Sequence, residues 1–548
     1  MPNAAAPQDS QKVFARQATG LVRGVSPFSA AIFNLSNAPI GFVIVYSSIL
    51  GFGFFAGGSI LLGTLLAIVG SIPVLLNYVF LTASMPRTGG DYVFISRLLH
   101  PAIGFAGNFA LAIIQIVGAG AVATFVALSG VAPAFSTLAN ITGDSSFESI
   151  AEWAATSHGS FIIGAAVLTL MSGLMILGTT TALRFNTIVW FVGMFSLVLM
   201  IGVLLFTSHA SFVSDFNSFV AKSSGITDGY QTMIERARNS GFEERNGLHM
   251  LWPLIAVGMF GCGWFFWSTY ISGEIKGARQ MGRETRIMLG GAVVNGVVLI
   301  TVLALIMKTF GSTFISCLTW LLFNAPEKVP FFTGEGAQVV FLTGLAAGSS
   351  VLASLFVITF IAWMLPLLTC YLLGVQRCAF AWSFDQVVPT RLSRVNSRTN
   401  TPVLLIVIVW ILSVGACAIS AYTDLIVQIF ASTFLGTALA SMALAALAAA
   451  VFPYRKPEIY AGSPIAKYKV GKIPLITITG VIALLFTLFW CAAYVVFPEF
   501  GMHENSGILL VFLVGSFVLG LVIYDISRSV RTRQGLPMDL VFAEVPPE

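Results

Sequence analysis

The sequence predicts an all-α polytopic membrane protein with about twelve transmembrane helices. Three observations support this fold class. Of the 548 residues, 57% are hydrophobic and only 9% are charged, whereas about 25% of residues are charged in ordinary soluble domains. Apolar runs of at least the roughly 20 residues that cross a hydrocarbon core recur between residues 28 and 524. Basic residues are also concentrated in alternate connecting segments, which is typical of membrane proteins.

The spans follow one another from the N-terminus with short connections, apart from two longer ones. Residues 1–24 are polar and lack the apolar centre of a secretory signal, so we expect a cytoplasmic tail. We expect spans at residues 25–52, 59–85, 102–137, 161–180, 186–206, 250–272, 285–310, 342–373, 402–421, 425–451, 474–496 and 507–524. Residues 211–249 form an outer loop, and residues 525–548 form a second cytoplasmic tail.

Charge sets the predicted orientation. With the N-terminus inside, most of the 28 basic residues fall in cytoplasmic segments, as the positive-inside rule requires. The exceptions lie in or beside the two longest outer loops and are Lys222, Arg236, Arg238, Arg245, Lys308 and Lys328. The longest polar connection is therefore outside, between the fifth and sixth spans. A major-facilitator fold would instead place its long loop inside, between the sixth and seventh.

Two short apolar segments suggest an internal repeat. The segment 311–335 contains STFISCLTWLLF, which is too short to span, and DYVFISRLLH at 91–100 has an apolar helical face. The first follows the seventh span and the second follows the second span. This placement is expected if residues 25–210 and 250–453 are two inverted repeats of five spans, followed by two more spans at 474–524.

The first span is predicted to break in its middle. Asn34, Ser36, Asn37, Pro39 and Gly41 crowd its centre, and Pro39 cannot donate the hydrogen bond that a continuous helix needs. Helix halves that meet in the membrane present N–H groups to an anion and carbonyl groups to a cation. A zwitterion fits such a site. A simple proline kink with small packing residues is the alternative.

A second interruption is predicted in the sixth span, where Gly258, Gly261 and Gly263 fall within six residues. An interrupted membrane helix is costly unless its freed backbone groups are satisfied. Paired interruptions at corresponding places in two repeats indicate a solute site. We therefore expect the two breaks to form one site.

Three motifs resemble those of the amino acid-polyamine-organocation (APC) permeases. PRTGGDYVFISRLLHPAIGF at 86–105 is similar to the PxxGGxY signature after their second span. SGEIKGARQMGRETRI at 272–287 resembles their inner segment after the sixth span, with Gly277 and Ala278 in place of the usual Asn-Pro pair. FDQVVPTRLSRVNSRTNTP at 384–402 resembles the loop before their ninth span. The order and spacing match over most of the chain.

The resemblance implies a leucine-transporter-like fold of five plus five inverted spans with two more at the end, and transport by alternating access. Carried over by position, the backbone around Ser36, Asn37, Ala38 and Gly41 would face a solute carboxylate. The amino group would meet the break at Gly258, Met259, Phe260, Gly261 and Cys262. Phe260 or Trp264 would cover the solute. The side chains of Asn34, Ser36 and Asn37 would either bind part of the solute or satisfy the unwound backbone.

The coupling ion stays unassigned between Na⁺, H⁺ and none. No charged side chain lies near the centre of a predicted span, so the default type of proton site is absent from those centres. Ser350, Ser354 and Thr359 in the eighth span are a possible cation site, because sodium needs only neutral oxygens. The same hydroxyl groups also join helices together.

Charged residues on the inner side suggest a latch. Glu274, Lys276, Arg279, Arg283 and Glu284 follow the sixth span, and Arg87 and Asp91 follow the second. Opposite charges there would pair while the cytoplasmic path is closed. Exposed pairs contribute only about 0–1 kcal/mol each, so a latch requires several.

The sequence does not favour an enzyme. Its histidines and cysteines lack metal-ligand spacing, and no GxxxxGK[ST] phosphate loop indicates an ATP-driven pump. We interpret the chain as a multi-pass permease of the plasma membrane for amino acids or related small amines, with no cofactor and no nucleic-acid partner. The alternatives are a permease of the same fold for polyamines, purines or another nitrogenous solute, and a transporter-like solute sensor.

Overall fold

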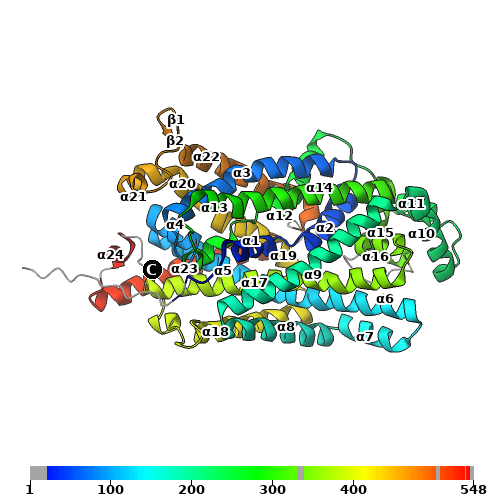
Figure 1. The fold of residues 1–548 in the computed structure, drawn as a ribbon, viewed down its shortest axis with the longest axis horizontal. Helices are drawn as coiled ribbons and strands as arrows, with labels where there is room; N and C mark the ends of the chain where they lie inside the picture. Colours follow the sequence, from blue (N-terminus) through cyan, green and yellow to red (C-terminus); the bar gives the residue numbers. More distant parts are fainter. Residues whose placement is uncertain (1–20, 22, 330–337, 502–505, 537, 544–548) are drawn as a thin grey trace, which may run out of the picture.

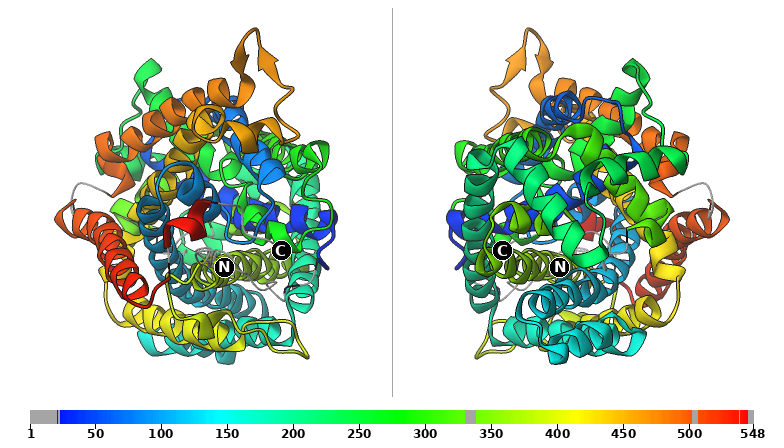
Figure 2. Two further views of the ribbon diagram at one scale, coloured as in Figure 1. Left: turned by 90° about the vertical axis from the view of Figure 1, so that its left-hand side faces the viewer. Right: turned by 90° about the vertical axis from the view of Figure 1, so that its right-hand side faces the viewer.

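The computed structural model describes residues 21, 23–329, 338–501, 506–536 and 538–543. Within these residues, twelve helices are long and apolar enough to cross a membrane. They run side by side along the long axis of the molecule (Figure 1) and form one closely packed bundle when viewed from either end (Figure 2). The predicted fold class, an all-α polytopic membrane protein, is confirmed.

The first five spans occupy the chain up to residue 206. The first consists of α1 (Pro27–Asn37), α2 (Ile40–Ser48) and a π-helical turn, Ile49–Phe54. The second is α3 (Ile60–Ser84), and the third is α5 (Pro101–Phe125), which continues through a π-helical turn into α6 (Ala132–Thr142). The fourth and fifth are α8 (Ser157–Leu177) and α9 (Thr179–Phe206).

The next five spans begin at residue 251. The sixth is α12 (Leu251–Cys262) followed by a 3₁₀ helix, η4 (Trp267–Glu274). The seventh is α13 (Met281–Thr285) with α14 (Gly291–Phe310), and the eighth is α17 (Ser350–Phe384). The ninth is α18 (Val403–Tyr422), and the tenth joins α19 (Leu425–Thr437) to α20 (Leu444–Arg455). The last two are α22 (Leu475–Val496) and α23 (Ser506–Arg533).

The connecting elements gather at the two ends of the bundle. One end carries α7 (Ser145–Ala155), α10 (His209–Ser224) and α11 (Gly229–Asn239), and α15 (Ser312–Asn324) and α16 (Gln338–Ala346) lie towards it (Figure 1). The other end carries α4 (Asp91–Leu98), α21 (Pro457–Ala461), the strands β1 (Lys469–Val470) and β2 (Ile473–Pro474), and α24 (Met538–Ala543). Segments predicted to be cytoplasmic therefore share one end of the molecule.

The second and sixth spans are held together by small residues. A Cβ atom built on Gly258 of α12 would lie 2.7 Å from the Cα atom of Thr64 on α3. A Cβ atom built on Gly63 would in turn lie 2.8 Å from the carbonyl carbon of Leu254. Only glycine allows backbones to approach this closely, as is common between membrane helices. The α3–α12 contact fixes the sixth span beside the second.

The eighth span differs from its predicted bounds, 342–373. The structure separates α16 from α17, and α17 continues through Gln376 and Arg377 to Phe384. Polar residues usually mark the end of a span, but both of these side chains are buried and bonded within the bundle. Their polarity therefore does not end the helix.

Candidate functional site

The first span is interrupted where the sequence predicts it. Helix α1 ends at Asn37, Ala38 has non-helical φ and ψ angles of −125° and 68°, and α2 begins at Ile40. Pro39, which lacks an N–H group, separates the two helices. The last carbonyl groups of α1 and the first N–H groups of α2 lack partners within their own helices. This interruption therefore offers both acceptors and donors in the middle of the bundle.

The sixth span is interrupted later than predicted. We expected the break at residues 258–263, but α12 stays helical as far as Cys262, and the chain turns at residues 263–266 before η4. Gly258 packs against α3, and a Cβ atom on Gly261 would lie 2.8 Å from a Leu299 side-chain carbon and 2.9 Å from one of Val43. These two glycines therefore allow close helix packing. Of the three glycines, only Gly263 lies in the turn at residues 263–266.

Side-chain amides tie the two interruptions together. The Asn295 Nδ2 atom donates to the Gly261 carbonyl at 2.9 Å and lies 3.4 Å from the Ala38 carbonyl. The Asn37 Nδ2 atom donates to the Trp264 carbonyl at 3.3 Å. Because each contact uses a backbone group freed by a break, the breaks hold each other in place.

Two of the predicted solute-binding polar residues bond to neighbouring helices. Asn34 donates to the Ser268 Oγ atom at 3.0 Å and accepts from the Ser268 N–H group at 2.6 Å. Ser36 donates to the Ile32 carbonyl at 2.7 Å and accepts from Asn186 at 2.8 Å. Both side chains are buried and neither lines the cavity. Their contacts match the expectation that these polar groups satisfy buried backbone and side-chain atoms.

A cavity lies beside the two interruptions and has an empty volume of about 460 Å³, which includes open solvent. Its lining comes from the first, third, sixth, eighth and tenth spans. The lining residues are Asn37, Pro39, Phe42, Ile114, Gln115, Gly118, Phe260, Trp264, Trp267, Leu367, Tyr371, Thr433, Phe434 and Thr437. None of these described residues carries a charge. A charged group of a solute would therefore depend on helix ends and aromatic rings for stabilisation.

Three polar atoms of the lining residues are free to bind a solute. The Asn37 Oδ1, Gln115 Oε1 and Trp264 Nε1 atoms are buried without a hydrogen-bond partner. An unpaired buried polar group costs about 1–3 kcal/mol. The lining residues therefore contribute two unpaired acceptor atoms and one unpaired donor atom.

The rings predicted to cover the solute pack into an aromatic cluster. Phe260 stacks on Tyr46 with ring centroids 4.2 Å apart and meets Phe434 edge-on at 4.7 Å. Trp264 meets Trp490 edge-on at 5.3 Å. These contacts hold both rings at the cavity wall, where Phe434 of the tenth span is in contact with each of them.

The remaining predicted site residues do not line the cavity, and all of them are buried except Gly41, which is half-buried. They are Ala38, Gly41, Gly258, Met259, Gly261 and Cys262. Gly41 packs so closely on the eighth span that an added Cβ atom would lie 2.2 Å from the Trp363 ring. The structure thus brings Asn37, Phe260 and Trp264 to the cavity. The roles of the other residues in solute binding stay predictions.

The possible cation site joins the eighth span to the fifth. The Thr359 Oγ1 atom lies 2.6 Å from the Ser196 Oγ atom of α9 and 2.5 Å from the Leu355 carbonyl. Ser354 is half-buried on α17, and the side chain of Ser350 lies outside the described part of the structure. Cation binding at these residues stays a prediction.

Several lining residues did not emerge from the sequence. Gln115 lies on α5, Tyr371 on α17, and Thr433, Phe434 and Thr437 on α19. Gln115 carries the one available signal, because a glutamine inside an apolar span is costly and often functional. The others are of types that membrane helices use widely for packing.

A comparison with protein families identifies the relatives of this fold. A family model described as amino acid permease matches residues 26–519. The chain belongs to the amino acid permease family. The resemblance to the APC permeases is thereby confirmed, and the permease is a membrane transporter for amino acids or related solutes. A comparison with curated proteins gave no match.

A buried ion pair joins the sixth and eighth spans of the permease. Arg377 Nε donates to Glu274 Oε1 at 2.6 Å, and Arg377 Nη2 donates to Glu274 Oε2 at 3.0 Å and to Thr179 Oγ1 at 2.6 Å. The Glu274 carbonyl also accepts from the Val25 N–H group at 3.0 Å. The start of the first span, the sixth, the fifth and the eighth thus meet at the Glu274–Arg377 pair.

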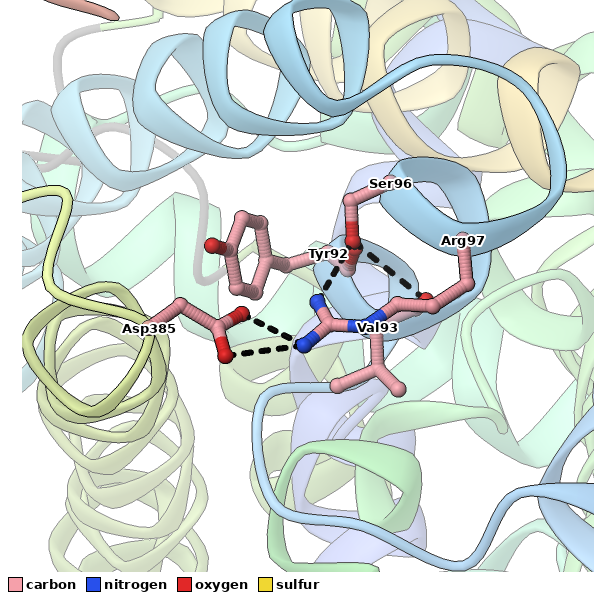
Figure 3. Close-up of polar contacts among 5 residues, drawn as sticks. All are labelled: Tyr92, Val93, Ser96, Arg97 and Asp385. Atoms are coloured by element: carbon pink, nitrogen blue, oxygen red, sulfur yellow. Dashed lines mark hydrogen bonds and ion pairs between the residues drawn. The ribbon is translucent and has the colours of Figure 1, made fainter. Parts of the chain in front are cut away.

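A second buried pair joins α4 to α17. Figure 3 shows the Arg97 guanidinium facing both carboxylate oxygens of Asp385, at 2.8 and 2.6 Å, with the Tyr92 ring beside them. The Arg97 guanidinium carbon lies 5.0 Å from the Phe542 ring centroid, so α24 packs against the pair.

The latch therefore differs from the expected one. Opposite charges do pair, but Glu274 pairs with Arg377 of the eighth span rather than with the loop after the second span. Asp91 contacts a tyrosine. Both ion pairs are buried and the Glu274–Arg377 pair is bidentate, so they are not the weakly stabilising exposed pairs that the inner loops suggested.

Proposed function

We propose that the permease carries amino acids or related small amines across the plasma membrane by alternating access, with the solute held between the interruptions of the first and sixth spans. The observation that carries this proposal is the uncharged cavity beside the two breaks with its unpartnered polar atoms. A solute carboxylate fits the N-terminal end of α2, where N–H groups and the helix dipole favour an anion.

An amino group fits the opposite ends of the helices. The C-terminal ends of α1 and α12 present carbonyl groups and negative dipole ends. The free Asn37 Oδ1 and Gln115 Oε1 atoms add acceptors, and aromatic faces attract a cation. These partners favour a solute that contains a protonated amine.

The proposed cycle opens the two ends of the bundle in turn. Solute enters from outside, the first, second, sixth and seventh spans rock against the others, and solute leaves inward. Inward release separates Glu274 from Arg377. Glu274 lies on the sixth span, which rocks, and Arg377 lies on the eighth span, which stays in place. Val25 moves with the sixth span, because its backbone pairs with residues 274 and 276.

Solute exchange in proteoliposomes tests the proposal. Vesicles that contain the purified protein and a mixture of unlabelled amino acids should take up labelled leucine, arginine or glutamate faster than protein-free vesicles. Uptake of putrescine or adenine alone would move the solute class to polyamines or purines. Thermal stabilisation by an amino acid without any exchange would indicate a sensor. The absence of both exchange and stabilisation would contradict the proposal.

Cysteine labelling tests the proposed orientation. The six native cysteines are buried, so introduced ones give a clean signal. Lys222 on α10 and Lys472 beside β2 are exposed at opposite ends of the molecule. On intact cells, a membrane-impermeant maleimide should label Lys222→Cys strongly and Lys472→Cys only after permeabilisation. The reverse pattern would contradict a cytoplasmic location of the termini.

A further inference from the structure

Asp91, the first residue of α4, is a buried carboxylate that has no cationic partner in the described part of the chain. Asp91 is 1% exposed, and Tyr270 of η4 donates a hydrogen bond to its Oδ2 atom at 2.6 Å. Its Oδ1 atom is buried and has no hydrogen-bond partner. Among the described residues, Asp91 forms no ion pair. A buried charge in this state is costly, whereas the protonated carboxyl is not.

The groups that face Asp91 from the surrounding elements are all neutral. They are Tyr78 of α3, Tyr270 of η4, Cys378 of α17 and Ser441 between α19 and α20. The charged residues on and beside α4 are engaged elsewhere. Arg97 pairs with Asp385, Arg455 of α20 donates to the Leu99 carbonyl at 2.6 Å, and Arg87 before α4 donates to the Pro86 carbonyl at 3.1 Å. Nothing in the described surroundings therefore neutralises an ionised Asp91.

This environment favours the protonated carboxyl. Burial raises the pKa of Asp91 from an ordinary value of 3.8 to about 6, although the Tyr270 hydrogen bond and the nearby hydroxyl groups of Ser441 and Tyr78 lower it in part. A raised pKa means that the folded structure prefers the neutral form. The contribution of Asp91 to stability is thus complete below about pH 3.8 and is lost as the pH rises through about 6.

Tyr270 connects Asp91 to both the cavity and the inner ion pair. The same short helix, η4, carries Trp267 at the cavity wall and Glu274 at the ion pair with Arg377. The Trp267 and Tyr270 rings are in contact, with centroids 4.9 Å apart. A change in the charge of Asp91 therefore acts on the segment that closes the cytoplasmic side.

We propose that Asp91 is a proton-binding site, and that the cytoplasmic side of the permease opens when Asp91 releases its proton. The neutral carboxyl can stay buried against Tyr270 in the closed arrangement seen here. The ionised carboxylate needs water or a cation, and it gains water when η4 and α4 separate. The proton leaves to the cytoplasm with no other bond made or broken.

Infrared titration of the full-length protein in lipid tests proton binding without any solute. The wild type should show a carboxylic C=O band that disappears with a midpoint near pH 6. This band should be missing from Asp91→Asn. The Tyr270→Phe variant loses a donor to the ionised form, so its midpoint should rise by on the order of one pH unit. A band that persists in Asp91→Asn would overturn the assignment of the proton-binding site to Asp91.

The pH dependence of exchange tests the opening step, which rests on the proposed function. With equal pH on both sides and labelled leucine, arginine or glutamate as probe, wild-type exchange should rise about tenfold between about pH 5 and pH 7. A group that titrates near pH 6 changes over this range from about one-tenth to about nine-tenths ionised. Asp91→Asn should stay at the slow, low-pH rate throughout.

Glu284 of α13 provides the matched comparison, because it is also buried and both of its carboxylate oxygens lack partners. Glu284→Gln should keep the wild-type pH profile. A pH dependence of exchange that is lost in Glu284→Gln and kept in Asp91→Asn would overturn the proposal. Wild-type exchange that does not change with pH would also overturn it. If no probe is exchanged at all, the proposed function fails, and the infrared titration alone decides the proton site.

Discussion

Replacement of Arg377 by methionine should lower the free energy of unfolding by about 3–5 kcal/mol, because it leaves Glu274 as an uncompensated buried charge. Glu274 accepts two hydrogen bonds from Arg377 and has a fully enclosed position at the meeting point of four spans. The loss should appear as a large fall in the midpoint of thermal unfolding, followed by tryptophan fluorescence of the purified protein.

Two further variants make this result specific. The double variant Glu274→Met with Arg377→Met removes both charges and keeps similar volumes, so it should recover most of the lost stability. Arg245→Met breaks the Arg245–Glu499 pair, whose arginine side chain is 54% exposed, and should cost no more than about 1 kcal/mol. If Arg377→Met were as mild as Arg245→Met, the buried pair would not hold the inner side closed.

Replacement of Gln115 by leucine should weaken solute binding roughly 10- to 100-fold. The cavity loses an unpaired acceptor, whose hydrogen bond to the solute contributes about 1–3 kcal/mol to binding. The Gln115 Nε2 atom has only a long contact, 3.5 Å, to Thr437, so the variant leaves little else unpaired. Thermal stability without solute should therefore change little. Calorimetric titration with the amino acid that best stabilises the wild type measures the change.

Gln376→Leu is the matched control for this variant. Gln376 on α17 is equally enclosed and also has a buried Oε1 atom without a partner, but it does not line the cavity. Its replacement should leave the dissociation constant within about twofold of the wild type, because it removes no group that faces the solute. Equal losses of affinity in the two variants would mean that Gln115 acts through general packing.

The first interruption could be predicted from the sequence, whereas the position of the second could not. Pro39 breaks a helix by its covalent structure, in any surroundings. A glycine only permits a break, and Gly258 and Gly261 serve close packing against α3, α14 and α2 instead. The difference between a packing glycine and a turn glycine depends on neighbours that are distant in the sequence.

The same limit explains the inner side and the cavity. The clustering of charges predicted ion pairs near the cytoplasmic end, but Glu274 and Arg377 are 103 residues apart in the chain. Arg377 resembles any basic residue at the end of a span until α17 is seen to extend past it. Gln115 and Thr437 likewise become neighbours only when the third and tenth spans pack together.

A density map of the purified permease with a saturating amino acid that stabilises it tests the central claim most directly. The account predicts solute density in the cavity, within hydrogen-bond distance of the N-terminal end of α2, and in contact with Asn37, Gln115 or Trp264. Solute density confined to another part of the bundle, or an empty cavity at a concentration that saturates binding, would contradict it.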